Sequence, residues 1–479
     1  MSSARSLSLL APFAVCALIV GWAMLAAASL QAATLSVLVY AVANFIVYTD
    51  ALDFVLRLYV WRRHTATASP GSASRDLSID LPAILLGRRR RIVPRPSYAI
   101  IASVFNLGDR VEDFVRAFAP YRERMWLISD GSTDHTVTQL HQAGWRCFDD
   151  GVNRRKPGAL RLLLEQLPAH IETVMVVDPD IRIRRRRAGS TADLERVIDD
   201  FQQSGAAAVC PRVMIEPDGF LARFQAFEYA LSFRAGRASL ADYGITSGVS
   251  IYRRDALQRA LQAHSLSVYA EDLEIAVLLL AEGERIYYDG RLVVSTEGAG
   301  SLGRWFSQRV GWYHGLLKVC VQRLSEIWRI RRLAPFAMYH FVVYLGGLTL
   351  ALHFVKIVSA ALLVSSFLGG VHNIFVVNLF PKDTLTNPGY FAGAITSYIA
   401  LGVVALFTVV PRSERAYVAP IVPLYLLYAL THIVPMTVGF GNFVALRLWG
   451  RRLYRDYYEP DTSADEAALT RRLVAGRAW

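Results

Sequence analysis

The sequence has few cysteines and lacks several patterns that would each indicate a familiar class of protein. Its 479 residues include four cysteines, and their spacing matches neither a zinc-ligand pattern nor a disulfide framework. No segment repeats along the chain, and none reads GxxxxGK[ST], the glycine-rich sequence that cradles phosphates in many nucleotide-binding proteins. These absences argue against a zinc-stabilised or disulfide-bonded domain, a repeat protein, and a transporter with a nucleotide-binding domain of that type.

Apolar residues are concentrated at the two ends of the chain. Residues 7–30 carry no charge and are long enough to span about 30 Å of hydrocarbon. A cleaved signal peptide is the alternative, but this run is longer than a signal peptide needs, and residues 34–61 add a second apolar stretch. We therefore expect two transmembrane helices within residues 1–62, followed by a basic linker over residues 63–94.

The C-terminal third is apolar again. Residues 336–380 form one long block that would make either one tilted helix with a re-entrant piece or two helices. Residues 390–410 and 418–438 are two further candidates, and the prolines of the last would kink it. We expect two helices in the long block, which gives about six spans in all, with a C-terminal transmembrane region at 336–446 and a cytoplasmic tail at 447–479.

The placement of charge is typical of a membrane protein. The net charge is +12, with 52 Lys and Arg against 40 Asp and Glu, and nucleic-acid binding would explain such an excess. The basic clusters, however, border the apolar segments, which is the positive-inside pattern. We expect a multi-pass protein of the plasma (inner) membrane that binds no nucleic acid and whose central region is cytoplasmic. The arginine run at 182–187 would be a solvated loop, or a contact for lipid headgroups or phosphate.

The central region, residues 95–300, alternates short buried strands with helices. Strands are expected at 98–104, 125–129, 145–148 and 173–177, and helices at 110–118, 134–142 and 157–166. This alternation predicts a mostly parallel sheet whose ligands bind beyond the carboxyl ends of its strands. Polar motifs stand at those ends.

Two of these motifs suit a nucleotide. Asp130 ends a strand in ISDGSTD, where its carboxylate could accept hydrogen bonds from a nucleobase or ribose; an ordinary turn with a helix cap is the alternative. Lys156 precedes a proline in NRRKPGAL, at the start of a helix where a phosphate is favoured. A solvent-facing lysine explains that motif equally well.

Carboxylates dominate the next two motifs. Asp178 and Asp180 follow a buried strand in VVDPD and face one side of an extended segment, where they suit Mg²⁺ or Mn²⁺ shared with a diphosphate. A strand followed by a polar turn is the alternative. Glu271 and Asp272 begin a helix in AEDLE, and repulsion between them would raise one pKa towards the range of a general base. Acids that complement the helix dipole would look the same.

The motif QRVGW offers an amide, a cation and an aromatic plane in Gln308, Arg309 and Trp312. The tryptophan could stack on a sugar or anchor the chain at a membrane interface. Residues 301–335 alternate large apolar residues with basic ones, which predicts amphipathic helices lying at a membrane surface.

In their order and spacing, these motifs resemble those of the membrane-integrated family-2 glycosyltransferases, the inverting group that includes cellulose, hyaluronan, chitin-oligosaccharide and alginate polymerases. The resemblance covers residues 98–312. It implies an α/β GT-A (Rossmann-like) cytoplasmic domain inserted between transmembrane α-helices, a UDP- or GDP-sugar donor, and Mg²⁺ or Mn²⁺.

The resemblance also implies roles for single residues. It assigns the donor to Asp130, Lys156, Asp178 and Gln308, the metal to Asp178 and Asp180, the catalytic base to Asp272, and the acceptor to Glu271, Trp312 and a motif made of Ser247, Gly248, Arg253 and Arg254. Two positions depart from the family. Gly311 replaces an arginine, so we expect Arg309 to bind the donor diphosphate, and Ser247 stands where many polymerases have cysteine.

The resemblance implies an inverting transferase that builds a β-linked polysaccharide and extrudes it across the bilayer. It would act alone, as a homo-oligomer, or with export partners. A transferase that adds a single sugar to a membrane lipid is the alternative, because it would carry the same carboxylates without a transmembrane channel.

Overall fold

The computed structural model describes residues 97–184, 192–238, 240, 242–266, 269–330 and 399–454. The chain divides into two compact units. The larger comprises Trp61–Gly346 with Val434–Trp479, and the smaller comprises Met1–Val60 with Gly347–Ile433. The last described helix therefore belongs to the same compact unit as the central region.

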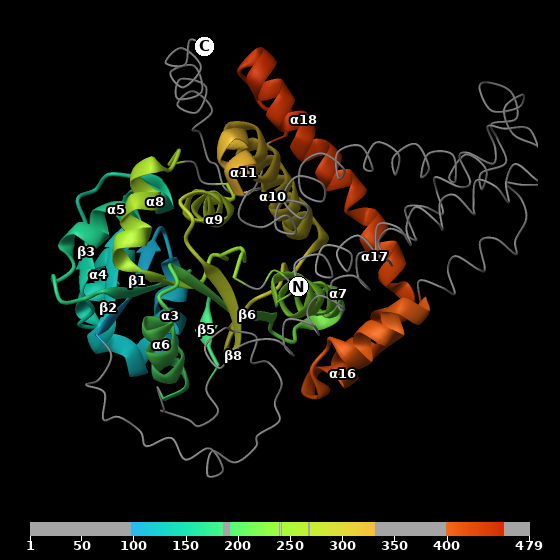
Figure 1. Cartoon of the computed structure of the whole chain (residues 1–479), viewed down its shortest axis with the longest axis horizontal. Helices are drawn as coiled ribbons and strands as arrows, with labels where there is room; N and C mark the ends of the chain where they lie inside the picture. Colours follow the sequence, from blue (N-terminus) through green and yellow to red (C-terminus); the bar gives the residue numbers. More distant parts are fainter. Residues whose placement is uncertain are drawn as a thin grey trace, which may run out of the picture. The chain divides into compact units, whose positions relative to one another are not determined.

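An eight-stranded sheet organises the larger unit, with the strand order β3-β2-β1-β4-β7-β6-β8-β5 (Figure 1). The strands are β1 Tyr98–Val104, β2 Met125–Ser129, β3 Cys147–Phe148, β4 Thr173–Val176, β5 Arg182–Ile183, β6 Ala208–Ile215, β7 Ser250–Arg253 and β8 Ile286–Thr296. The predicted parallel pairing is confirmed from β3 to β4. Beyond β4 the sheet is mixed, because β7 returns antiparallel to both β4 and β6.

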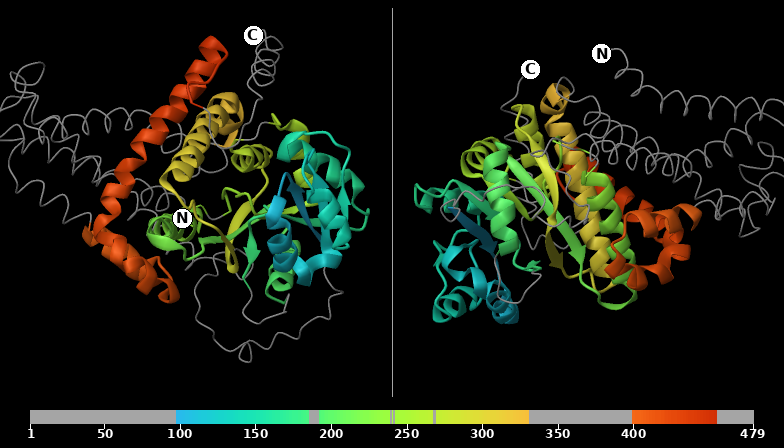
Figure 2. Two further views of the ribbon diagram at one scale, coloured as in Figure 1. Left: turned by 180° about the vertical axis from the view of Figure 1, so that it is seen from behind. Right: turned by 60° about the horizontal axis from the view of Figure 1, so that its bottom comes forward.

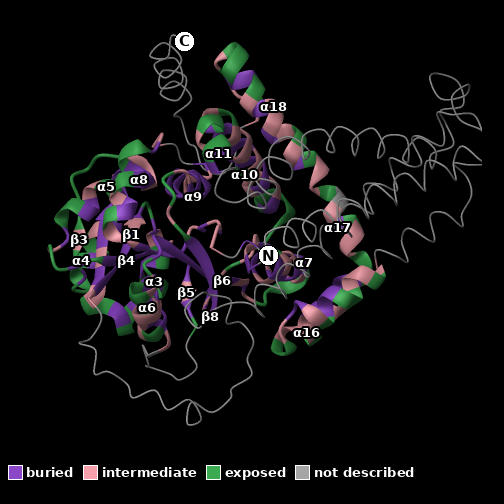
Figure 3. Ribbon diagram, viewed as in Figure 1, coloured by how far each residue is buried: buried purple, intermediate pink, exposed green. Residues whose placement is uncertain are grey.

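Helices cover both faces of this sheet. They are α3 Val111–Phe118, α4 Thr136–Gln142, α5 Arg155–Gln166, α6 Ala192–Ser204, α7 Gly219–Ala230, α8 Arg254–Ala263 and α9 Glu271–Ala281. Successive residues of β1 enter two different hydrophobic cores: Ile100 and Ala102 pack with α3 and α6, and Ala99 and Ile101 pack with α5, α8 and α9. Figure 3 shows the strands buried between these layers.

Two further helices continue the larger unit after β8. α10 spans Leu302–Gln322 and α11 spans Leu324–Ile330, within the stretch predicted to be amphipathic. α18, Ile433–Trp449, packs on α10 (Figure 2). A Cβ added at Gly439 would lie 2.7 Å from Val310 O, so the two helix backbones approach closely.

In the smaller unit, the structure describes Ile399–Thr408, α16 Arg412–Val418, the 3₁₀ helix η6 Ala419–Leu424 and α17 Tyr425–Thr431. Among the described helices, none is by itself long and apolar enough to cross a bilayer, whereas the bent pair Arg412–Ala429 and Ile433–Trp449 reaches that length and composition together. The spans predicted at 7–30, 34–61 and 336–380 lie outside the described residues.

Candidate functional site

The predicted motifs meet at one edge of the sheet because of how its strands run. β1, β2 and β4 are parallel, so Asp130 after β2 and Asp178 after β4 leave the same edge. β7 runs antiparallel to β4, with Ser250 opposite Val176, so the residues that precede β7 reach this edge from the other direction. Gly248 consequently lies against Asp178, and motifs far apart in the sequence share one site.

Lys156 joins three of these motifs. It lies in the first turn of α5, and its Nζ is 2.5 Å from Asp178 Oδ1 and 3.0 Å from Glu271 Oε1. Burial lowers the pKa of Lys156, but the two carboxylates outweigh burial and hold the pKa well above its ordinary value. The lysine therefore stays charged and ties the end of β4 to the start of α9.

Gly248 makes room for this contact. A Cβ added there would collide with Asp178 Oδ2 and would lie 3.7 Å from Lys156 Nζ. A side chain at this position would therefore push the aspartate away from the lysine. The structure places Gly248, predicted as part of the acceptor motif, beside the predicted metal ligand.

Asp178 and Asp180 offer the oxygen ligands that a divalent cation requires. Thr296 Oγ1 donates a hydrogen bond of 2.7 Å to Asp180 Oδ2, which orients this carboxylate. Within that part, no group of three or more His, Cys, Asp or Glu side chains forms a complete cation site. The pair therefore fits Mg²⁺ or Mn²⁺ whose other ligands come from a diphosphate and water.

Asp130 holds the start of α5 against the end of β2. Its Oδ1 accepts a hydrogen bond of 2.6 Å from Arg154 N. Gly131, at a φ of +73°, turns the chain so tightly that a Cβ would lie 2.7 Å from Asn153 N. Burial raises the pKa of Asp130 to about 6, and backbone hydrogen bonds from Arg154 and Arg155 limit the rise. The side chain is thus mostly ionised at neutral pH, and its contact with a nucleotide stays a prediction.

Asp272 lies in the first turn of α9, next to the glutamate that pairs with Lys156. Ala270, which precedes the helix, has a φ of +54°, a left-handed conformation that non-glycine residues rarely adopt. Thr246 Oγ1 donates a hydrogen bond of 2.7 Å to Asp272 O and fixes the backbone. Burial raises the pKa of Asp272, and Arg237 and Lys156 oppose part of that rise. A rigidly held carboxyl with a raised pKa suits a general base.

A buried ionic network that the sequence analysis missed anchors α9. Glu274 is fully buried, and it accepts hydrogen bonds of 2.6 Å from both Arg323 Nη2 and Ser265 Oγ. These contacts hold the helix that carries Asp272 against the end of α8 and the start of α11. The available signal was that Glu274 stands between Leu273 and Ile275 at the start of the apolar run of α9, where an acid needs a buried partner.

The QRVGW motif lies on α10, and its cation is engaged elsewhere. Arg309 is 1% exposed, its Nη2 is 2.6 Å from Glu228 Oε2, and its guanidinium lies 4.0 Å from the centroid of the Trp312 ring. Burial and a carboxylate partner argue against the predicted contact of Arg309 with a diphosphate. Trp312 is 38% exposed and Gln308 is half-buried, and their predicted contacts with acceptor and donor stay predictions.

The hydroxyl of Ser247 is also engaged within the protein. Its side chain is buried, and its Oγ donates a hydrogen bond of 2.6 Å to Val249 O. Ser247 N in turn donates to Ser250 Oγ at 3.0 Å. The serine therefore shapes the turn that presents Gly248, and its predicted contact with an acceptor stays a prediction.

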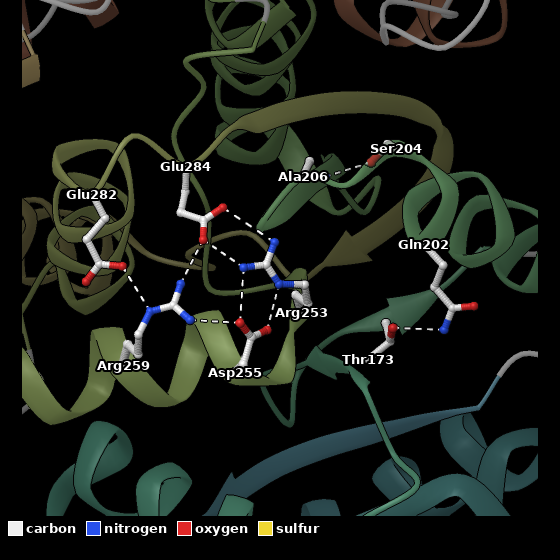
Figure 4. Close-up of polar contacts among 9 residues, drawn as sticks. All are labelled: Thr173, Gln202, Ser204, Ala206, Arg253, Asp255, Arg259, Glu282 and Glu284. Atoms are coloured by element: carbon white, nitrogen blue, oxygen red, sulfur yellow. Dashed lines mark hydrogen bonds and ion pairs between the residues drawn. The ribbon is translucent and has the colours of Figure 1, made fainter.

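The two arginines of the acceptor motif lie at the opposite edge of the sheet. Arg253 is paired with Thr173, at the start of β4, and forms ion pairs in a surface cluster with Asp255 and Glu284 (Figure 4). Arg254 donates hydrogen bonds to four carbonyls near the end of α5, including Leu164 O at 2.8 Å. Both arginines therefore stabilise the fold at a distance from the predicted site, because β7 runs from that site to the opposite edge of the sheet.

The arginine run after β4 shows ion pairs within the protein. Arg182 and Arg184 lie 3.2 and 3.1 Å from the two carboxylate oxygens of Glu216, and residues 185–191 lie outside the described part of the chain. The start of the run is therefore strand β5 rather than a loop, and its predicted contact with lipid headgroups or phosphate stays a prediction.

Comparison with known proteins supports the fold. No protein-family model matches the chain, and no curated protein matches it. The mannosyltransferase PcManGT from Pyrobaculum calidifontis, solved with GDP-mannose and Mn²⁺, is similar over 83% of this chain and 99% of its own, at 17% identity and a TM-score of 0.50. Glucosyl-3-phosphoglycerate synthase from Mycobacterium tuberculosis is similar over 47% of this chain and 80% of its own, at 14% identity and a TM-score of 0.33. The first likeness confirms the predicted GT-A, Rossmann-like fold.

Proposed function

We propose that this chain is an inverting, metal-dependent glycosyltransferase that takes its sugar from a nucleoside diphosphate donor. The observation that carries the proposal is the cluster around Lys156, whose Nζ lies within 3.0 Å of both Asp178 and Glu271. This cluster joins the predicted metal ligands to the predicted base at the edge where GT-A-like sheets bind ligands.

Each residue of this site has a separate role in the proposed reaction. Asp178 and Asp180 would hold Mg²⁺ or Mn²⁺, which when bound offsets negative charge on a departing diphosphate. Lys156 keeps the carboxylates on both sides of the reaction centre in place. Asp272 takes the proton from the acceptor hydroxyl as the acceptor oxygen bonds to the anomeric carbon and the bond from that carbon to the diphosphate breaks. The attack comes from the side opposite the leaving group, so an α-linked donor gives a β-linked product.

The finer proposal is that the product is a β-linked polysaccharide made on the cytoplasmic face of the inner membrane and extruded across it. Its support is the sequence: apolar segments flank the central region on both sides, and basic clusters border them. Homo-oligomers or export partners would complete the path of the polymer.

A second candidate is the addition of a single sugar to a membrane lipid. Two observations favour it. Gly311 supplies no side chain where processive enzymes of the resembled family carry an arginine, and Arg309 is occupied by Glu228. This candidate keeps the same donor, metal and base and differs only in the acceptor.

The test is transfer by the purified full chain in lipid or detergent, with a panel of radiolabelled nucleotide sugars and either Mn²⁺ or Mg²⁺. GDP-mannose and UDP-glucose come first, because the proteins with similar structures were solved with these donors. Long products indicate a polymerase, and a lipid-extractable product with one or two sugars indicates the second candidate. The absence of transfer from every donor, in a protein that folds and binds nucleotide, would refute the proposal.

A further inference from the structure

Arg237 occupies a part of the site that no predicted motif includes. It ends a π-helical segment, η4 Leu231–Arg237, that continues directly from α7. Such segments are uncommon and are frequently found at functional sites. Three side chains form a ladder along this stretch: the Tyr229 ring stacks on the Phe233 ring at 5.7 Å, and the Arg237 guanidinium lies 4.1 Å from the centroid of the Phe233 ring. The ladder holds the guanidinium in a fixed place.

The hydrogen bonds of Arg237 go to uncharged groups. Nη1 donates to Ser232 Oγ at 3.1 Å, and Nη2 donates to Thr246 O at 3.3 Å. Nε is buried and has no hydrogen-bond partner among the described residues. Within the same residues, Arg237 forms no ion pair, whereas Lys156 and Arg309 each contact a carboxylate. A partly buried guanidinium whose hydrogen bonds go only to uncharged groups, and which forms no ion pair among the described residues, can bind an anion.

Arg237 is also linked to the backbone of the proposed base. The residue whose carbonyl accepts its hydrogen bond, Thr246, donates in turn to the backbone of Asp272. On the other side, the aromatic ladder connects Arg237 to Tyr229, whose pKa is raised to about 12 mainly by burial and also responds to the charges of Arg237 and Asp180.

We propose that Arg237 binds a phosphate group of the substrate. It would supply the positive charge that an arginine supplies at the position of Gly311 in the resembled family. This inference rests on the proposed glycosyltransferase function. The phosphate comes from the donor diphosphate or from a phosphorylated acceptor, and the same fork of N–H donors would serve either source.

The experiment measures the binding of UDP and GDP to the full-length protein with Mn²⁺, followed by steady-state transfer kinetics. Arg237→Gln is expected to weaken binding of the preferred nucleotide by about ten-fold to a hundred-fold, because it removes a charge-assisted contact. Arg237→Lys keeps the charge but loses the fork and should fall in between. Ser232→Ala releases Nη1 without changing the charge, and a loss of a few-fold is expected.

The matched control is Arg259→Gln, in the surface cluster of Figure 4, which should leave nucleotide binding unchanged. Weaker nucleotide binding in Arg237→Gln places the phosphate on the donor. Unchanged nucleotide binding with at least a ten-fold higher KM for a phosphorylated acceptor, and not for a neutral one, places it on the acceptor.

Two outcomes overturn the inference. One is wild-type binding and kinetics in Arg237→Gln. The other is an equal loss in Arg237→Gln and Arg237→Lys together with a lowered melting temperature in both, because the arginine is then only structural. A wild-type protein that binds UDP or GDP but transfers no sugar would overturn the proposed function and leave the anion contact of Arg237 standing.

Discussion

Replacing Glu274 with glutamine tests whether the buried ionic network holds the base-bearing helix. Burial alone would raise the pKa of Glu274, but His264, Lys318, Ser265 and Arg323 outweigh it and lower the pKa from 4.5 to about 2. At ~1.4 kcal/mol per pKa unit, such a shift stabilises the folded state by about 3 kcal/mol. Glu274→Gln removes this contribution and leaves the charge of Arg323 buried with a weaker partner.

The counter-charges in this network come from Arg323 and Lys318. The Nδ1 of His264 accepts a hydrogen bond of 2.8 Å from Leu266 N, so the ring proton is on Nε2, which faces Glu274. Burial lowers the pKa of His264, and its ring is therefore neutral at pH 7. Glu326, 3.4 Å from Arg323 Nη1, would compensate in part for the missing carboxylate. We therefore expect a net loss of about 2–3 kcal/mol, below the full cost of breaking a buried ion pair.

The assay is thermal unfolding of the full chain followed by fluorescence, with nucleotide-sugar turnover as a second measurement. The melting temperature should fall by roughly 4–9 °C at neutral pH. A depressed carboxyl pKa stabilises the fold above pH 4.5, and that stabilisation is lost as the pH falls towards 2. The difference in melting temperature between variant and wild type should therefore be constant from pH 5 to 8 and become smaller below pH 4.5.

The control is Glu282→Gln, at the exposed end of the same helix, where an ion pair with Arg259 is worth little. It should shift the melting temperature by about 1 °C at most. If Glu274→Gln lowers the melting temperature by only about 1 °C, or if its difference in melting temperature from the wild type does not narrow in acid, the network does not stabilise α9.

Three further predictions concern the proposed chemistry. Asp180→Asn should abolish glycosyl transfer without lowering the melting temperature, and excess chelator should stop the wild type; full activity in chelator would contradict the metal assignment. Asp272→Asn should lower kcat by a factor of about 10²–10⁴ while nucleotide affinity is kept, and an equal loss of affinity would make Asp272 a binding residue. Because burial raises the pKa of Asp272, wild-type kcat should fall in acid at a pH above 3.8, and Arg237→Gln should move this loss of activity to higher pH. Gly248→Ala should weaken Mn²⁺ and nucleotide binding at least ten-fold by displacing Asp178, which calorimetry would measure. The matched control is Gly300→Ala, because Gly300 also lacks a positive φ and a Cβ there meets nothing within 4 Å, so binding should be unchanged.

The sequence predicted the part of the site that follows from strand order. Buried runs of four or more apolar residues mark β1, β2 and β4, and the carboxyl ends of parallel strands meet at one edge, so Asp130 and Asp178 were expected together. Lys156 was expected near a phosphate, and the structure places it between two carboxylates. That pairing depends on the contact between α5 and α9, which no local pattern encodes.

The residues that the sequence misplaced or missed depend on packing between distant segments. As the cation of the QRVGW motif, Arg309 was expected to contact a ligand. In the structure it is buried and paired with Glu228, about eighty residues away in the chain. Arg237 belongs to no motif. Its capacity to bind an anion is evident only in the structure, where its hydrogen bonds go to an uncharged hydroxyl and an uncharged carbonyl. The antiparallel direction of β7 was missed for the same reason, since direction depends on the path of the chain through α7 and η4.

The contact at Gly315 has a consequence for changing the acceptor. A Cβ on this residue of α10 would lie 2.8 Å from Tyr269 Cβ and 2.9 Å from Ala270 Cβ, so α10 is pressed directly on the turn that starts α9. The helix that presents Gln308 and Trp312 and the turn that sets the position of Asp272 must therefore shift together. An engineer who reshapes α10 to admit a different acceptor would also tilt the proton-accepting group, and selectivity could not be altered there without altering rate. Substitutions that leave the 315 contact intact are the ones that could separate the two properties.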